Sequence, residues 1–214
     1  MSKHENVLEQ VYEPRRLIEA WQRRCAGAMK RNAGAAGIDR MSVKEFEERK
    51  EELMPIIRNK LMDGTYRFKP ALRVEIPKPG TSKTRKLGIP VIMDRIVSTS
   101  IQRVFEQIFE GDFTSSNYGF RRGKSQHQAI EYVKKKVEEG YSWCAAIDLK
   151  GFFDEIPHEL IFKLIRKKIA DERMVTLIAR ALKAGVIVDG VFEKTTKGCR
   201  QGGICKALHI EEHF

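Results

Sequence analysis

The sequence lacks the features that mark membrane-spanning and secreted proteins. No apolar run approaches the ~18 residues of a membrane span, and the N-terminal segment MSKHENVLEQ has no apolar core of the signal-peptide kind. The four cysteines form no Cys-x-x-Cys pair, which is typical of reduced intracellular thiols. We therefore expect a cytoplasmic protein without disulfides.

Candidate zinc ligands gather only near the end of the chain, at Cys199, Cys205, His209 and His213. Common zinc modules place their paired cysteines about two to four residues apart, and this run does not match that spacing. Chance cysteines and histidines are the commoner explanation for such a run. We expect no metal there.

Positive charge is in excess. The 40 Lys and Arg against 29 Asp and Glu give a formal net charge of +11. An excess of this size favours a polyanionic partner, because each cation that neutralises a phosphate also releases a counterion. Many soluble proteins are basic without binding nucleic acid, so charge alone leaves both interpretations open.

The apolar periodicity changes from helical to strand-like and back along the chain, which predicts an α+β fold. Ser42 and Glu45 form a capping-box signature, and Pro55 is expected to shorten or kink the helix that follows. The expected elements are two helices over 5–31 joined near Pro14, a tight turn over 32–42, a helix over 43–62, a hairpin of strands 71–78 and 85–91, helices over 94–110 and 125–139, a short buried strand over 143–148, helices over 158–169 and 171–184, and a hairpin over 186–193.

Three helices show apolar faces at helical spacing, and these faces are expected to form the core. Their residues are Leu17, Ile18, Trp21 and Cys25, then Val43, Phe46, Leu53 and Ile57, then Ile96, Val97, Ile101, Val104, Phe105 and Ile108.

Asp148 ends the apolar run WCAAID and begins the segment DLKGFFDEIPH. A carboxylate at the end of a buried strand is held rigidly, as metal-assisted phosphoryl transfer requires, because Mg²⁺ prefers oxygen ligands. Asp also commonly turns a chain after a strand. The residues alone favour neither role.

A basic turn joins the strands of the 71–91 hairpin. A hairpin brings Lys78 and Arg85 together, where the two cations can grip a triphosphate. Lys83 and Lys86 lie beside them and fit a solvated basic turn better.

Two further segments suit ligand contact. YGFRRGKS (118–125) combines aromatic rings, which could stack on bases, with Arg121, Arg122 and Lys124, which could bind phosphates. The rings could equally pack in the hydrophobic core. In KGCRQGG (197–203) the glycines let backbone approach a ligand closely, which is a weak signal by itself.

In this order the motifs resemble those of reverse transcriptases, the group II intron-encoded reverse transcriptase/maturases in particular. GAAGIDRMS resembles their N-terminal extension motif, IPKPG…RKLGIPVIMDRIV and NYGFRRGKS their fingers motifs, IDLKGFFDEIPHELI palm motif A, and KGCRQGG the Gln-Gly-Gly loop. The resemblance implies the fingers and a partial palm of a right-hand polymerase. The implied parts are an N-terminal helical extension (1–40), fingers (41–140), a partial palm (141–203) and an atypical tail (204–214).

The resemblance also implies roles for the matching residues. Asp148 would be the first metal-binding carboxylate, with the Leu149 carbonyl as a further Mg²⁺ ligand. Phe153 would be the steric gate that excludes a 2′-hydroxyl.

Other matching residues would bind the substrates. Lys78 and Arg85 would hold the triphosphate of a dNTP. Gln201 would line the nucleotide pocket, and Gly202 would leave room for the template-primer backbone. The 118–125 segment would contact RNA.

The sequence departs from the family after residue 199. Arg200 stands where Pro is usual, and ICKALHIEEHF replaces Ser-Pro and a long apolar helix. No Tyr-x-Asp-Asp and no Asp-Asp pair occurs. Because one carboxylate cannot hold two Mg²⁺ ions against water, we expect a truncated RNA-directed DNA polymerase that is inactive alone.

The alternative is a non-catalytic RNA-binding remnant that assists the folding and splicing of intron RNA. Under the first interpretation the partners are template RNA, primer DNA and a dNTP. Related fingers domains can pair, which leaves a homodimer open.

Overall fold

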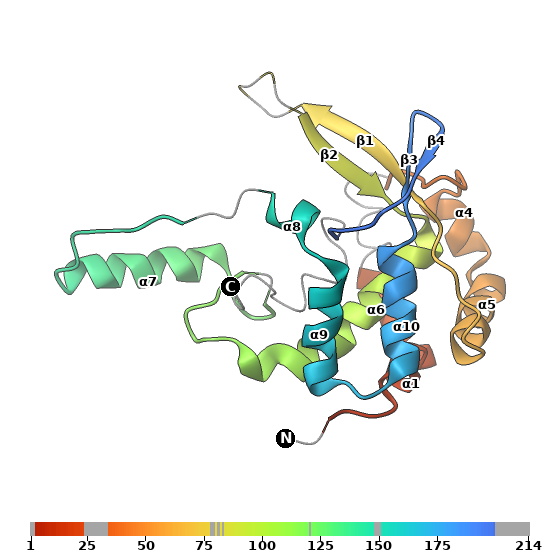
Figure 1. The fold of residues 1–214 in the computed structure, drawn as a ribbon, viewed down its shortest axis with the longest axis horizontal. Helices are drawn as coiled ribbons and strands as arrows, with labels where there is room; N and C mark the ends of the chain where they lie inside the picture. The colour runs from red at the N-terminus through yellow and green to blue at the C-terminus, as the bar shows by residue number, and fades with distance from the viewer. Residues whose placement is uncertain are drawn as a thin grey trace.

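The computed structural model describes residues 3–23, 34–77, 80, 82, 84–119, 121–147 and 151–199, with Arg85 described by its backbone only. Figure 1 shows a group of packed helices beneath a small sheet, with α7 projecting to one side. This mixture confirms the α+β fold class. None of the described helices has the length and apolar character needed to cross a membrane.

The described elements follow the expected order along the chain, except at the strand expected over 143–148 and within the helix expected over 43–62. The helices are α1 (Val7–Val11), α2 (Pro14–Trp21), α4 (Val43–Glu48), α5 (Lys50–Met62), α6 (Ile92–Phe109), the 3-10 helix η2 (Glu110–Asp112), α7 (Gln126–Glu138), α8 (Phe152–Glu155), α9 (His158–Lys168) and α10 (Glu172–Leu182), and the strands are β1 (Ala71–Pro77), β2 (Thr84–Ile89), β3 (Val186–Val188) and β4 (Val191–Glu193).

The helix expected over 43–62 is divided in two at Arg49, whose φ of −104° and ψ of 12° leave helical geometry. Its start was predicted correctly, because the Ser42 hydroxyl accepts a hydrogen bond from the Glu45 amide at 3.1 Å. Pro55 does not cause the division and lies inside α5. The predicted single helix is therefore wrong in its length.

The four described strands form one sheet in the order β2-β1-β3-β4. The β1–β2 hairpin is antiparallel from Leu72↔Ile89 to Pro77↔Thr84, and the β3–β4 hairpin turns at Asp189-Gly190, where both residues have positive φ. β1 and β3 run parallel. The two predicted hairpins thus join across more than a hundred residues of chain.

The core is built around α6, which packs against α1 and α2. All six of its residues that were expected inside are buried. Of the α2 residues expected inside, Leu17 and Trp21 are buried, whereas Ile18 is 47% exposed and was predicted wrongly. Cys25 lies outside the described residues.

The N-terminal segment packs on the C-terminal helices of the fold. The His4 amide donates to the Lys168 carbonyl at 2.7 Å, and the Ala170 amide donates to the His4 carbonyl at 2.9 Å. The Asp171 carboxylate caps α10 and also accepts from the Leu8 amide at 2.9 Å. One hydrophobic core therefore runs from Val7 to Cys199.

The strand expected over 143–148 is not present in the described part of that segment. Residues 141–147 form neither strand nor helix, and Trp143 and Ile147 are 95% and 88% exposed. A strand needs a hydrogen-bonded neighbour, and the four described strands pair only with one another. The apolar sequence of this segment predicted a strand, but it gave no information about whether a neighbouring strand is present. Asp148 itself lies outside the described residues.

Candidate functional site

Two motifs that lie some forty residues apart in the sequence meet in the fold. The Cys199 amide donates to the Phe153 carbonyl at 2.7 Å, and the Gly198 amide donates to the Ile156 carbonyl at 2.8 Å. Lys197 pairs with Pro157 in an antiparallel bridge. The start of the KGCRQGG segment is therefore bound along the end of the DLKGFFDEIPH segment.

Side chains reinforce this junction. His158 is buried, and its Nε2 donates to the Gly198 carbonyl at 2.9 Å. Lys197 and Glu155 form an exposed ion pair. The buried His158 was not assigned a role from the sequence, because a lone histidine gives no sign of its distant partner.

Gly198 is required at the junction for two reasons. Its φ is +76°, a conformation that side-chain-bearing residues rarely adopt. A Cβ at this position would lie 2.5 Å from the Asp154 carbonyl oxygen and 2.9 Å from that of Phe153. The glycine thus allows the two backbones to touch.

The predicted steric gate lies directly beside this junction. Phe153 is half-buried in α8, and its ring packs against that of Phe152 with centroids 5.5 Å apart and planes at 76°. Gly151 precedes α8 in the left-handed conformation, with φ +65°. Asp148, Leu149, Gln201 and Gly202 lie outside the described residues.

The fingers hairpin carries the predicted triphosphate cations near its free end. Pro77 pairs with Thr84 and Ile76 with Arg85, so Lys78 follows directly after the last paired position. Lys78 and the side chain of Arg85 lie outside what is described. Glu75, Ile76 and Pro77 are exposed, and Figure 1 shows this end projecting beyond the body.

Arg121 is held within the protein. Its guanidinium donates to Glu110 at 2.7 and 3.2 Å, to the Thr114 carbonyl at 2.7 Å and to the Asn117 carbonyl at 3.0 Å. Its side chain is only 9% exposed, and it lies over the Phe113 ring. These contacts fix the loop between η2 and α7.

The neighbouring cations of this loop are more accessible. Arg122 is exposed, and Lys124 is half-buried with its ammonium 5.0 Å from the centre of the Tyr118 ring. Phe120 lies outside the described residues. Arg122 and Lys124 therefore lie on a loop whose backbone is held in place by the contacts of Arg121.

The first two family-like motifs are also joined. Arg95 donates to the Pro90 carbonyl at 2.9 Å and to the Ala35 carbonyl. Gly37 packs so closely on this segment that a Cβ would lie 2.7 Å from the Val91 nitrogen. The tight, close-packing turn predicted from the glycines is confirmed for residues 34–40.

Asp94, in the same motif, is a buried acid. It accepts from the Tyr66 hydroxyl at 2.8 Å and the Lys69 amide at 2.9 Å. Burial, with the nearby Asp94 carboxylate, raises the pKa of Tyr66 well above its usual value. Asp94 thus joins α6 to the connection before β1.

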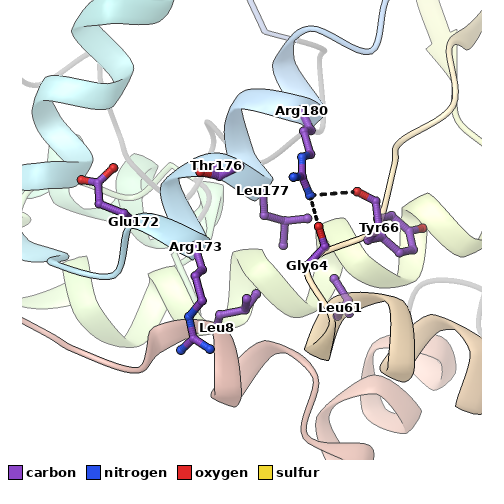
Figure 2. Close-up of a pocket in the computed structure, with 9 residues that line it drawn as sticks. All are labelled: Leu8, Leu61, Gly64, Tyr66, Glu172, Arg173, Thr176, Leu177 and Arg180. Carbon is purple, nitrogen blue, oxygen red and sulfur yellow. Dashed lines mark hydrogen bonds between the residues drawn. The ribbon is translucent and has the colours of Figure 1, made fainter.

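A hollow of about 240 Å³ lies away from the motifs, between α1, the end of α5 and α10. Figure 2 shows Arg180 reaching to the carbonyls of Gly64 and Tyr66, to which its Nη1 donates at 2.5 and 3.3 Å. Burial, with a smaller effect of Arg67, lowers the pKa of Arg180. These contacts tie α10 to the turn after α5.

Metal ligands do not cluster in the part of the chain that the structure covers. No group of three His, Cys, Asp or Glu side chains comes together there in a way that could hold an ion. The predicted donors, the Asp148 carboxylate and the Leu149 carbonyl, are oxygen ligands of the kind that Mg²⁺ prefers.

The fold and the paired motifs define the class of protein: they correspond to the fingers and part of the palm of a reverse transcriptase. Among solved structures, a partial Cas6-RT-Cas1–Cas2 complex matches 96% of this chain with a TM-score of 0.57 at 15% identity, over 34% of its own chain. The model for the family "Reverse transcriptase (RNA-dependent DNA polymerase)" matches residues 76–208. The chain belongs to this family.

The curated relatives agree with the group II intron resemblance. Protein YkfC of Escherichia coli K12 is 35% identical over 95% of this chain and 54% of its own length. Group II intron-encoded protein LtrA of Lactococcus lactis subsp. cremoris is 36% identical over 83% of this chain and 29% of its own. The chain thus spans about half of one relative and under a third of the other.

Proposed function

We propose that these residues form the RNA- and nucleotide-binding half of a Mg²⁺-dependent RNA-directed DNA polymerase of the group II intron type. The 214 residues alone bind RNA without extending a primer. In the complete reaction the primer 3′-hydroxyl attacks the α-phosphorus of a dNTP and pyrophosphate leaves. Bound Mg²⁺ would lower the pKa of that hydroxyl and stabilise the developing charge.

The backbone pairing of residues 153–156 with 198–199 carries the proposal. Asp148 is five residues from Phe153, and Gln201 is two residues from Cys199. An extended chain spans at most about 18 Å over five residues and about 7 Å over two. These limits support a shared site, because they keep both residues within reach of the junction.

Each site residue has a proposed role at this junction. The Asp148 carboxylate and the Leu149 carbonyl would hold Mg²⁺, together with further donors that these two residues do not supply. The Phe153 ring, fixed against Phe152, lies against the sugar and rejects a 2′-hydroxyl. Gln201 and Gly202 line the nucleotide pocket.

The cations have separate roles. Lys78 and Arg85 bind the triphosphate. The hairpin register supports this, because Arg85 pairs with Ile76, which is only two residues before Lys78 in the sequence. Arg122 and Lys124 contact RNA phosphates from the loop that Arg121 fixes. Dispersed cations of this kind give affinity with little sequence preference.

The test is a chimera of residues 1–199 with the part of LtrA that follows the region matching these residues, assayed for primer extension on an RNA template. Asp148→Ala should abolish extension and leave RNA affinity within about twofold, because affinity comes from the dispersed cations. Phe153→Val should keep dNTP incorporation and admit ribonucleotides. Asp154→Ala, at a nearby exposed acid, is the matched control and should extend normally.

Thermal melts of each variant separate chemistry from folding. Loss of extension by Asp148→Ala without a lower melting temperature supports the assignment. Retained extension, or loss accompanied by unfolding, contradicts it. A chimera that binds RNA but never extends a primer points to the non-catalytic RNA-binding alternative.

A further inference from the structure

A groove of about 310 Å³ lies between the outer face of α6, the end of α2 and the loop before α7. Every side chain that lines it is polar or charged, so it offers no anchor for an apolar partner. The lining residues are Arg23, Thr99, Gln102, Arg103, Glu106, Arg121 and Arg122.

The four arginines divide into two kinds. Arg103 pairs with Glu19 at 2.8 Å and Arg121 with Glu110 at 2.7 Å, so these two belong to the walls. Arg23 and Arg122 are exposed, and neither has a carboxylate partner among the described residues. These two cations are available to a ligand, and guanidinium groups match phosphate oxygens well.

The α6 side of the groove adds an amide, a hydroxyl and a carboxylate to the arginines. Gln102 Nε2 donates to Glu106 Oε1 at 3.0 Å, which orients the half-buried carboxylate. Thr99 lies one helical turn away. A carboxylate weakens the binding of a bare anion, but it accepts strongly from a hydroxyl group. The groove therefore fits a ligand with both phosphates and hydroxyls.

We propose that this groove binds a ribonucleotide backbone, with phosphates on Arg23 and Arg122 and a 2′-hydroxyl on Glu106. The 2′-hydroxyl is what distinguishes RNA from DNA at a given contact. The proposal rests on the RNA binding proposed above and assigns it a site apart from the motif junction. Arg23 brings the N-terminal extension into that contact, and Glu106 brings α6 into it.

The test measures binding of a single-stranded RNA and a DNA of the same sequence to the full chain over a range of salt concentrations. Arg23→Gln with Arg122→Gln should weaken RNA binding about tenfold at low salt. The slope of log affinity against log salt should fall by roughly 0.7 for each phosphate that is no longer neutralised. The matched control, Lys60→Gln with Lys163→Gln, removes the same charge from exposed positions on α5 and α9.

Glu106→Ala tests the ribose contact separately. It should lower the ratio of RNA to DNA affinity about threefold to tenfold, because DNA has no 2′-hydroxyl to bind there. Circular dichroism melts verify that each variant is folded.

The outcomes are distinguishable. If the groove and control variants weaken binding equally, the groove is not the site, whereas the proposed RNA-binding function stands. An unchanged RNA-to-DNA ratio in Glu106→Ala overturns the ribose contact. A wild-type chain without salt-dependent RNA binding overturns both the groove and the proposed function.

Discussion

Replacing Gly198 by alanine perturbs the motif junction at one atom. The new Cβ would meet backbone, because the nearest atoms are the carbonyl oxygens and carbon of Asp154 and Phe153 at 2.5–2.9 Å. A side chain could rotate away, whereas these atoms move only with the whole α8 segment. The substitution therefore forces a choice between strain and separation of the two motifs.

Two contributions set the magnitude. Holding alanine at φ +76° costs roughly 1–2 kcal/mol, and inserting a methyl group into closed packing typically costs about 1–3 kcal/mol. We expect Gly198→Ala to lower the free energy of unfolding by roughly 2–5 kcal/mol. Gly190→Ala is the matched control, because Gly190 has φ +83° and nothing within 4 Å of its Cβ position. It should show the strain contribution alone.

Urea unfolding followed by circular dichroism gives both free energies. Amide hydrogen exchange adds a local readout, because the Cys199 amide should become less protected if the junction opens. Equal destabilisation by the two substitutions would refute the reasoning, since it would mean that the backbones at residues 154 and 198 have room for a side chain.

Further predictions concern the buried acids. Tyr66→Phe should cost about 1.5–3 kcal/mol, because Asp94 loses a charged hydrogen bond. The folded-state pKa of Tyr66 is raised, so its contribution is fully present below pH ~10 and lost as the pH rises further. Urea titrations should accordingly show a steeper alkaline loss of stability in wild type than in Tyr66→Phe. Asp171→Ala should lower stability by about 2–4 kcal/mol, because α10 loses its cap and the Leu8 amide its acceptor. Asp171→Asn keeps an accepting oxygen and should be destabilised less in the same urea titrations.

Local features of the fold could be predicted from the sequence. The two hairpins, the core face of α6 and the start of α4 depend on residues close together in the chain, such as Asp189-Gly190 and Ser42 with Glu45. Periodicity and turn chemistry act at that range. These elements therefore match the expectations.

Long-range contacts could not be predicted in the same way. The parallel pairing of β1 with β3 and the burial of Asp94 and Asp171 depend on partners far along the chain. The error over 143–147 has the same origin, because an apolar run becomes a strand only beside another strand. Arg121 shows the converse: its motif indicates RNA contact, yet its guanidinium is occupied by Glu110 and two carbonyls.

The functional sites show the same difference between local and long-range features. Sequence motifs indicated Phe153 and the KGCRQGG segment, and their backbone contact now joins them. The groove on α6 was not expected, because Arg23 belongs to no common motif with Arg103 and Glu106 and meets these two α6 residues only through the packing of α2 on α6.

The single core from Val7 to Cys199 has a consequence for how the chain tolerates a break. Residues 141–147 are exposed and contribute nothing to that core, so a protease should be able to cut there. The segments on either side would stay associated, because α1 and α6 before the cut pack with α9 and α10 after it. The nicked protein would behave as a non-covalent complex of two pieces that depend on each other to fold.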